Sequence, residues 1–198
     1  MDAIPSSTAP AANPTDALLL QQVVEHRPEA VAELYSRFSP TLLALARRIL
    51  GTTADAEEVL QEVFVHVWNH ADRYDAGRSS VSTWLVLLTR SRAIDRLRSR
   101  KVVERTHETA HLENPPEDTS PTGPEAVWMD ERRKMVGEEL AQLPPEQRQV
   151  LEMAFYEGLT QSEIAARAGL PLGTVKTRTL LAMKKLRGAL RSEIRQLL

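Results

Sequence analysis

The sequence predicts an all-α protein of two small helical domains joined by a flexible linker, with a helix-turn-helix in the C-terminal domain. Apolar residues recur with helical spacing along almost the whole chain, and no segment shows the sustained alternation of a strand. Prolines and acids concentrate between Glu113 and Pro124, a composition that can neither bury apolar area nor sustain a helix. A chain of 198 residues is long enough for two small cores.

These features give the expected domain boundaries. Residues 1–14 are small and rich in Ala and Pro, without the basic residues or apolar core of a signal peptide, and are expected to form a disordered tail. A first domain is expected over 15–102, an acidic Pro-rich linker over 103–125 and a second domain over 126–198.

In the first domain, the pattern predicts a helix over 16–26, a second from Pro28, a break at Ser39-Pro40 and a further helix over 41–50 that Gly51 ends. The clearest amphipathic helix spans 55–70. Its inward face carries an apolar set at the spacing i, i+3, i+4, i+7, i+8: Leu60, Val63, Phe64, Val67 and Trp68.

A polar loop over 73–82 follows, and then a helix over 83–101 that is apolar in its first half and basic in its second. In the second domain, helices are expected over 126–142 and from Pro145 to about Tyr156, followed by two helices separated by Gly169-Leu170-Pro171.

Those last two helices match a helix-turn-helix. Its fifth residue is small where the helices cross, its ninth is often Gly in the turn, and its fifteenth is a buried aliphatic anchor. Counting from Gln161, these are Ala165, Gly169 and Val175. The second helix is expected to bury Val175, Thr179, Ala182, Met183 and Leu186. Its opposite face suits the major groove of DNA and presents Thr174, Lys176, Thr177, Arg178 and Lys184. A plain helical hairpin is the alternative.

Charge is distributed in blocks along the chain. The net charge is only −2, but basic residues cluster over 90–105 and 176–195, on either side of an acidic segment over 108–125. The absence of cysteine excludes disulfides and thiolate metal sites. With no apolar run near the roughly 18 residues that span a bilayer, a cytoplasmic protein without membrane insertion is expected.

Three blocks, 55–68, 83–98 and 143–178, together resemble the extracytoplasmic-function (ECF) sigma factors of the sigma-70 family and cover most of residues 15–190. The resemblance implies a non-enzymatic initiation factor without cofactor or metal. It also implies that the first block docks on core RNA polymerase, the second binds and melts the promoter −10 element, and the third binds the −35 element. An anti-sigma factor is an implied partner.

Candidate residues lie in the first two blocks and in the loop between them. Those for polymerase binding are Asp55, Glu58, Gln61, Glu62, Phe64 and Trp68. Those for the −10 element are Tyr74, Ser79, Ser80, Trp84, Ser91, Arg92, Asp95, Arg96 and Arg98. These arginines, together with Arg100, would bind the melted strand, and the loop 74–82 is the expected pocket for a flipped base. Trp84 is also compatible with a core position. Ser91 departs from the family pattern, in which many members carry Asn.

Two other functions compete with this hypothesis. A transcriptional regulator that is not a sigma factor would explain the helix-turn-helix equally well, but not the first two blocks. His107-Glu108-x-x-His111 matches the zinc-binding pattern of metalloproteases, in which two His lie on one helix face and Glu acts as the base. It abuts the predicted linker and lacks the surrounding core that such a site needs.

Overall fold

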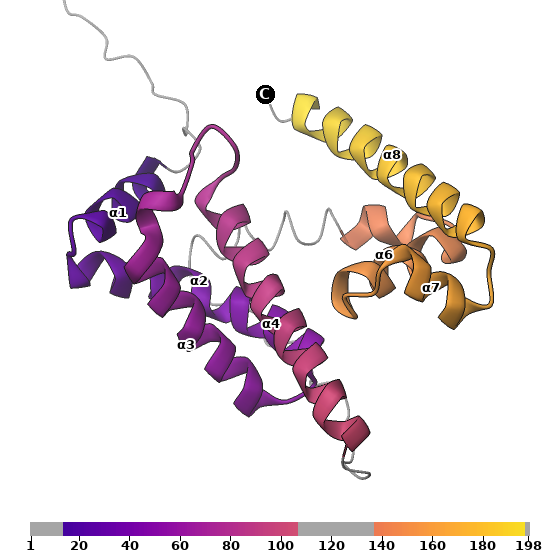
Figure 1. Ribbon diagram of the computed structural model, residues 1–198. Coiled ribbons are helices and arrows are strands. Elements are labelled where there is room, and N and C mark those ends of the chain that lie inside the picture. Colours follow the sequence, from indigo (N-terminus) through magenta and orange to yellow (C-terminus); the bar gives the residue numbers. More distant parts are fainter. Residues whose placement is uncertain (1–13, 107–136, 197–198) are drawn as a thin grey trace, which may run out of the picture. The chain divides into compact units, whose positions relative to one another are not determined.

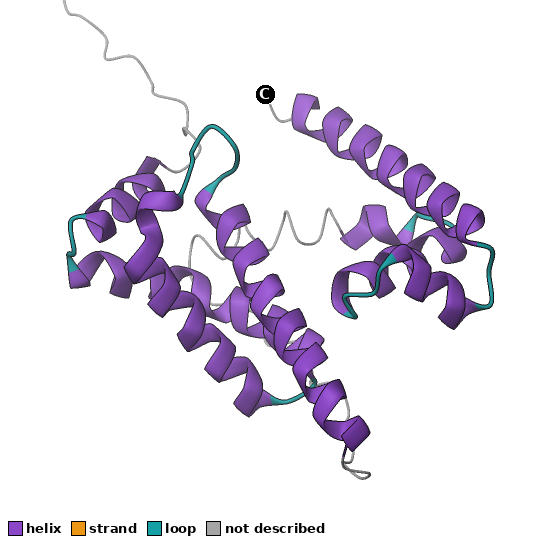
Figure 2. Cartoon of the chain, viewed as in Figure 1, coloured by secondary structure: helices purple, strands orange, loops and turns teal. Residues whose placement is uncertain are grey.

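The computed structural model describes residues 14–106 and 137–196, and the chain divides into two compact units, 1–119 and 120–198. In the described ranges every regular element is a helix, as the sequence predicts (Figures 1 and 2). Residues 1–13 of the predicted tail 1–14 and most of the predicted linker lie outside the described residues, whereas Pro14 begins the first helix.

The first unit is built around one long helix. It contains α1 (Pro14–Val24), α2 (Pro28–Leu50), α3 (Thr53–His70), the short 3-10 helix η1 (Ala71–Arg73) and α4 (Val81–Thr106), and α2 packs against α1, α3 and α4 (Figure 1). Its buried stripe recurs every four residues: Ala30, Leu34, Phe38, Leu42 and Ala46. The burial of this stripe against three helices positions α3 and α4 side by side.

The break predicted at Ser39-Pro40 is wrong. α2 runs continuously from Pro28 to Leu50, with Pro40 inside the helix and exposed on its outer side. Proline lacks the N–H that would donate to the Ser36 carbonyl, which normally disfavours a helix interior. The buried stripe on the opposite side continues through this position from Phe38 to Leu42, so tertiary packing outweighs the local penalty.

This observation predicts that Pro40→Ala stabilises the first unit. Alanine restores the missing backbone hydrogen bond, and we expect the free energy of unfolding to rise by about 1–3 kcal/mol. Urea unfolding followed by far-UV circular dichroism measures the change. The neighbouring Ser39→Ala keeps the proline and should change stability by no more than about 0.5 kcal/mol. An unchanged or lower stability of Pro40→Ala would contradict this prediction.

The second unit contains α6 (Pro145–Tyr156), α7 (Gln161–Ala168) and α8 (Leu172–Gln196), preceded by helical residues 137–141. The predicted helix-turn-helix is present. Ile164, Ala165 and Val175 are buried together with Val150, and Leu170 packs against this cluster. Gly169 ends α7 with a φ of 64°, a conformation that suits glycine, and its N–H donates to the Ala165 carbonyl.

Two details of the predicted elements need correction. Met183, expected in the buried stripe of α8, is 46% exposed, because it lies one residue beyond the inward-facing Ala182. The helix expected over 83–101 extends from Val81 to Thr106, so residues 103–106 of the predicted linker are helical.

Candidate functional site

Two stripes of opposite charge face each other between α3 and α4. Acidic residues on α3 lie at the spacing i, i+3, i+7, and arginines on α4 lie at i, i+4, i+8, so each set occupies one side of its helix. The acids are Asp55, Glu58 and Glu62, and the arginines are Arg92, Arg96 and Arg100. The packing of α3 against α4 turns the two stripes toward one another.

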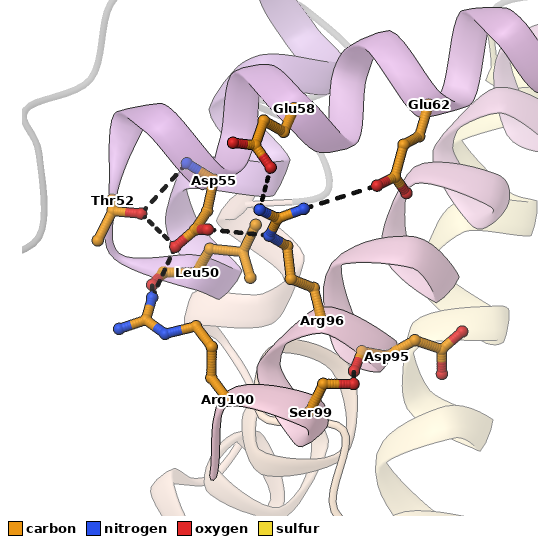
Figure 3. Close-up of polar contacts among 9 residues, drawn as sticks. All are labelled: Leu50, Thr52, Asp55, Glu58, Glu62, Asp95, Arg96, Ser99 and Arg100. Atoms are coloured by element: carbon orange, nitrogen blue, oxygen red, sulfur yellow. Dashed lines mark hydrogen bonds and ion pairs between the residues drawn. The ribbon is translucent and has the colours of Figure 1, made fainter. Parts of the chain in front are cut away.

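Asp55 lies at the centre of this contact (Figure 3). Its Oδ1 accepts from Arg96 Nε at 2.9 Å, and its Oδ2 accepts from Arg100 Nη1 at 2.8 Å. The Thr52 hydroxyl donates to the same Oδ2 at 2.7 Å, and Thr52 Oγ1 accepts from the Asp55 N–H, so Thr52 also caps α3. Arg100 Nη1 reaches the Leu50 carbonyl oxygen at 3.4 Å, which links α4 to the C-terminal end of α2.

The outer acids complete the ion-pair network. Arg96 Nη2 donates to Glu58 Oε2, and Arg96 Nη1 lies 3.6 Å from Glu62 Oε1 (Figure 3). Arg92 Nη1 lies 3.8 Å from Glu62 Oε2, and its Nη2 is 3.2 Å from His66 Nδ1. Burial, together with the positive charges nearby, lowers the pKa of His66 and favours its neutral form, which can accept from Arg92.

Next to this network is an open hollow of about 450 Å³, lined by Glu62, Arg92, Asp95, Arg96 and Ser99. Both cation and carboxylate groups line it. Asp95 is exposed there, and its backbone carbonyl accepts from Ser99 Oγ at 3.0 Å (Figure 3). The structure therefore shows a hollow beside the α3–α4 ion pairs.

Electrostatics favour the charged forms of the central pair. The hydrogen bond from Thr52 lowers the pKa of Asp55, and the hydrogen bond and charge of Arg96 and the charge of Arg100 act in the same direction against partial burial. The hydrogen bond to Asp55 raises the pKa of Arg96. Asp55 is therefore ionised in the folded protein at pH values where the unfolded chain would begin to protonate it.

This pKa shift predicts an acid-sensitive contribution to stability. Since the folded pKa of Asp55 lies below its ordinary value of 3.8, the contribution is complete above that value and is lost as pH falls through the folded pKa. The stability difference between wild type and Asp55→Asn, measured by urea unfolding at a series of pH values, should shrink in this acidic window. Substituting the exposed Asp72 by Asn should leave the wild-type profile unchanged. A difference that stays constant throughout acidification would contradict the shift.

The other predicted polymerase contacts differ in accessibility. Gln61 is exposed on α3. Phe64 is only 7% exposed and packs against the Tyr35 ring at a centroid distance of 4.8 Å, so it has little surface left for a partner. Trp68 is half-buried and meets the His26 ring edge-on at 5.5 Å. His26 occupies the turn between α1 and α2 with a positive φ of 61°.

The loop between η1 and α4 (Figure 2) is linked to the start of α4 by side-chain contacts. Tyr74 Oη donates to the Ser79 carbonyl at 2.8 Å, and the Tyr74 ring lies 5.6 Å from the Trp84 ring. Burial, with the nearby acids, raises the pKa of Tyr74. Ser80 Oγ accepts from the Thr83 N–H and caps α4. Trp84 is half-buried, so it is neither a core residue nor a fully exposed platform.

Three of the predicted −10 residues are exposed on the same side of α4. Ser91, Asp95 and Arg98 follow the spacing i, i+4, i+7 and are exposed, whereas Arg92 and Arg96 are turned toward α3. The predicted −10 set is thus divided between two sides of the helix.

The predicted −35 residues lie on the first turns of α8, apart from Lys184. Lys176, Thr177 and Lys184 are exposed, while Thr174 and Arg178 are half-buried. Thr177 Oγ1 donates to the Gly173 carbonyl at 2.9 Å. A capping box between Thr160 and Glu163 begins α7, the helix that supports α8. The sequence contains the pattern of a capping box, Thr followed three residues later by Glu, but this cap was not among the predicted features.

The sequence-based selection missed Thr52, which was detectable because it precedes α3 at a capping distance from Asp55. Arg100, expected only as a cation for the melted strand, continues the i, i+4 spacing of Arg92 and Arg96 and pairs with Asp55. The missing information was that these arginines face α3, which no local pattern reveals.

Comparison with known proteins identifies the family. Residues 34–102 match the family model for Sigma-70 region 2, and residues 140–188 match that for Sigma-70, region 4. The chain is 37% identical to the ECF RNA polymerase sigma factor RpoE of Cereibacter sphaeroides over 85% of its own length and 91% of the relative's. The chain belongs to the ECF sigma factors of the sigma-70 family. It is also 33% identical to the ECF sigma factor SigK of Mycobacterium tuberculosis, over 87% of this sigma factor and 91% of SigK.

Among solved structures, that of Rhodobacter sphaeroides SigE in complex with the anti-sigma ChrR matches 90% of this sigma factor and 99% of SigE, with 32% identity and a TM-score of 0.46. Family membership favours the sigma function over a regulator of another kind. The metalloprotease pattern His107-Glu108-x-x-His111 lies outside the described residues. Within 14–106 and 137–196, no cluster of three potential metal ligands occurs, and no helix is long and apolar enough to cross a membrane.

Proposed function

We propose that this sigma factor binds core RNA polymerase through the exposed side of α3, and that α4 and α8 contact the −10 and −35 promoter elements. The family membership carries this proposal, because the matched regions 2 and 4 include α3 and most of α4 and α8. The protein acts in the cytoplasm by binding alone. It has no catalytic residue or cofactor of its own, since the polymerase performs the chemistry.

The polymerase-binding surface is proposed to centre on Glu58, Gln61 and Glu62. Glu58 and Glu62 keep 60% and 48% of their side-chain surface exposed although both pair with arginines, so each can also accept a cation of the partner. Trp68 adds a half-buried ring at the far end of the same helix. Charge complementarity of this kind fixes orientation and association rate more than affinity.

The −10 surface is proposed to consist of Ser91, Asp95 and Arg98 on α4, together with the loop that carries Tyr74, Ser79 and Ser80. Exposed polar groups on one helix side suit base edges and phosphates. The loop lies against Trp84 at the start of the same helix, so an extruded base could be bound there by backbone and hydroxyl groups.

The −35 surface is proposed to be the outer side of α8, where Thr174, Lys176, Thr177 and Arg178 occupy the first turns. In helix-turn-helix proteins the N-terminal residues of the second helix contact base edges. Lys184, further along α8, is placed to bind a phosphate. No ion pair within the described part of the chain neutralises Lys176, Arg178 or Lys184, which leaves their charge for DNA.

An anti-sigma factor is a further proposed partner, as membership of the family implies. The similar SigE was solved with the anti-sigma ChrR. Such a partner would act by covering the surfaces that polymerase and promoter require.

The decisive experiment is transcription in vitro from a genomic DNA library with purified core polymerase and this protein as the sole sigma factor. Specific start sites should share two upstream elements, and core polymerase should retain the protein in a pull-down. Core polymerase alone is the control. Specific promoter binding by the free protein, with neither core binding nor transcription, would instead support a helix-turn-helix regulator.

A further inference from the structure

The arginines of the α3–α4 network have an unexpected orientation for DNA-binding residues. We propose that Arg96 and Arg100 are positioning residues that, with Asp55, brace α4 against α3, and that they do not bind promoter phosphates. The proposal rests on the proposed sigma function, and it removes Arg96 from the −10 contacts expected from the sequence.

The hydrogen-bonding capacity of Arg96 is directed into the protein. Its Nε donates to Asp55 at 2.9 Å, its Nη2 to Glu58, and its Nη1 faces Glu62 at 3.6 Å (Figure 3). All three nitrogens of the guanidinium thus point to carboxylates of α3. A phosphate would have to displace at least one of them, and it would approach a site that already carries negative charge.

Arg100 repeats this arrangement one turn later. It shares Asp55 with Arg96 and also reaches the Leu50 carbonyl, so one carboxylate joins α4 at two successive turns to the N-terminal end of α3. The side chains of Arg96 and Arg100 are 27% and 31% exposed. A planar guanidinium that donates along fixed directions sets the angle and rotation of a helix better than a point charge does.

The rotation of α4 matters because its outer side carries Ser91, Asp95 and Arg98. These residues lie on the exposed side, while Arg96 and Arg100 hold the opposing side against α3. Asp55, the carboxylate of the brace, belongs to α3, the helix proposed to bind polymerase. The brace therefore fixes the −10 surface relative to the polymerase-binding surface.

The direction in which one substitution changes promoter affinity distinguishes a brace from a DNA contact. Asp55→Asn removes a negative charge beside two arginines. If these arginines bound phosphates, freeing them should tighten promoter binding. If they brace α4, the loss of the Asp55 carboxylate should weaken promoter binding although the protein becomes more positive.

The test uses holoenzyme assembled with saturating core polymerase and a labelled promoter fragment that carries the −10 element, titrated at several salt concentrations. Asp55→Asn and Arg96→Gln should each weaken binding about tenfold, and the double variant no further, because both remove the same contact. The slope of log affinity against log salt should stay at the wild-type value. Glu57→Gln, a charge-matched control on an exposed side chain of α3 without an ion pair in the described residues, should bind as wild type.

Arg96→Lys gives a second, independent comparison. Lysine replaces arginine well as a phosphate-binding charge but not as a fork between carboxylates. The brace predicts that Arg96→Lys binds promoter nearly as weakly as Arg96→Gln. If Arg96→Gln fails to fold, which thermal unfolding would reveal, Arg96→Lys takes its place in the binding test.

Several results would overturn the brace. One is tighter promoter binding by Asp55→Asn. Another is a salt slope reduced by about 0.7–0.9 in Arg96→Gln, as expected for one lost phosphate contact. The third is wild-type promoter affinity in both variants. If wild-type holoenzyme bound no promoter, the sigma function would fail instead. Thermal unfolding of the free protein then still decides the brace, because additive effects of Asp55→Asn and Arg96→Gln on stability would exclude it.

Discussion

Ile164→Ala should unfold or severely loosen the helix-turn-helix while leaving the first unit intact. Ile164 is fully buried among Val150, Ala165 and Val175, at the contact between α7 and α8. Truncation of such a residue leaves a cavity and costs about 2–5 kcal/mol. That is a large part of the stability of a small domain, so the substitution should abolish transcription that depends on a −35 element.

Two measurements separate this outcome from general misfolding. Calorimetry should show that the unfolding transition of the second unit moves to lower temperature or disappears. A pull-down should show that the protein still binds core polymerase through its first unit. Leu180→Ala, which removes the same volume from a residue that is 69% exposed on α8, should change stability by no more than about 0.5 kcal/mol. A wild-type melting profile for Ile164→Ala would contradict the assigned core.

Arg178→Ala should relax the choice of −35 bases. Arg178 lies in the second turn of α8 beside the exposed Lys176 and Thr177, and an arginine that contacts a base edge contributes about 1–3 kcal/mol of discrimination. We expect binding to the preferred −35 element to fall toward that of altered elements. Competition of holoenzyme between promoter variants measures this ratio.

Lys184→Ala provides the contrast on the same helix. If Lys184 contacts a phosphate, its loss should weaken binding to all −35 variants alike and reduce the slope of log affinity against log salt by about 0.9. Arg167→Ala on α7 removes one positive charge from a side chain that pairs with Glu157, and should alter neither quantity. If Arg178→Ala and Lys184→Ala both acted uniformly across sequences, the proposed base contact of Arg178 would be excluded.

Much of the fold followed from local patterns. The spacing from Gln161 identified Ala165, Gly169 and Val175, and the structure shows two buried residues and a positive φ at these positions. The bounds of α3 and α6 were also close to those predicted, because capping residues and prolines mark helix ends. Ser39-Pro40 shows where this reasoning fails. A proline predicts a break from chain geometry alone, but burial on the opposite side of α2 retains the helix.

The site was harder to predict for a related reason. The sequence placed acids on one helix and arginines on another, and the resemblance assigned the first set to polymerase and the second to DNA. The structure brings Asp55 within 2.9 Å of Arg96, which lies 41 residues further along the chain. Phe64 likewise follows an amphipathic pattern that fits either a core or a contact, and only the Tyr35 ring against it shows that it is buried.

By itself, the sequence determined the helices, the helix-turn-helix and the family, since each depends on residues that lie close together in the chain. The tertiary structure decided which charges are available to a partner. Ion pairing depends on the distance and orientation of groups on different helices, and the packing of α3 and α4 on α2 sets both. For Arg96 and Arg100, that packing brings the carboxylate of Asp55 within hydrogen-bonding distance.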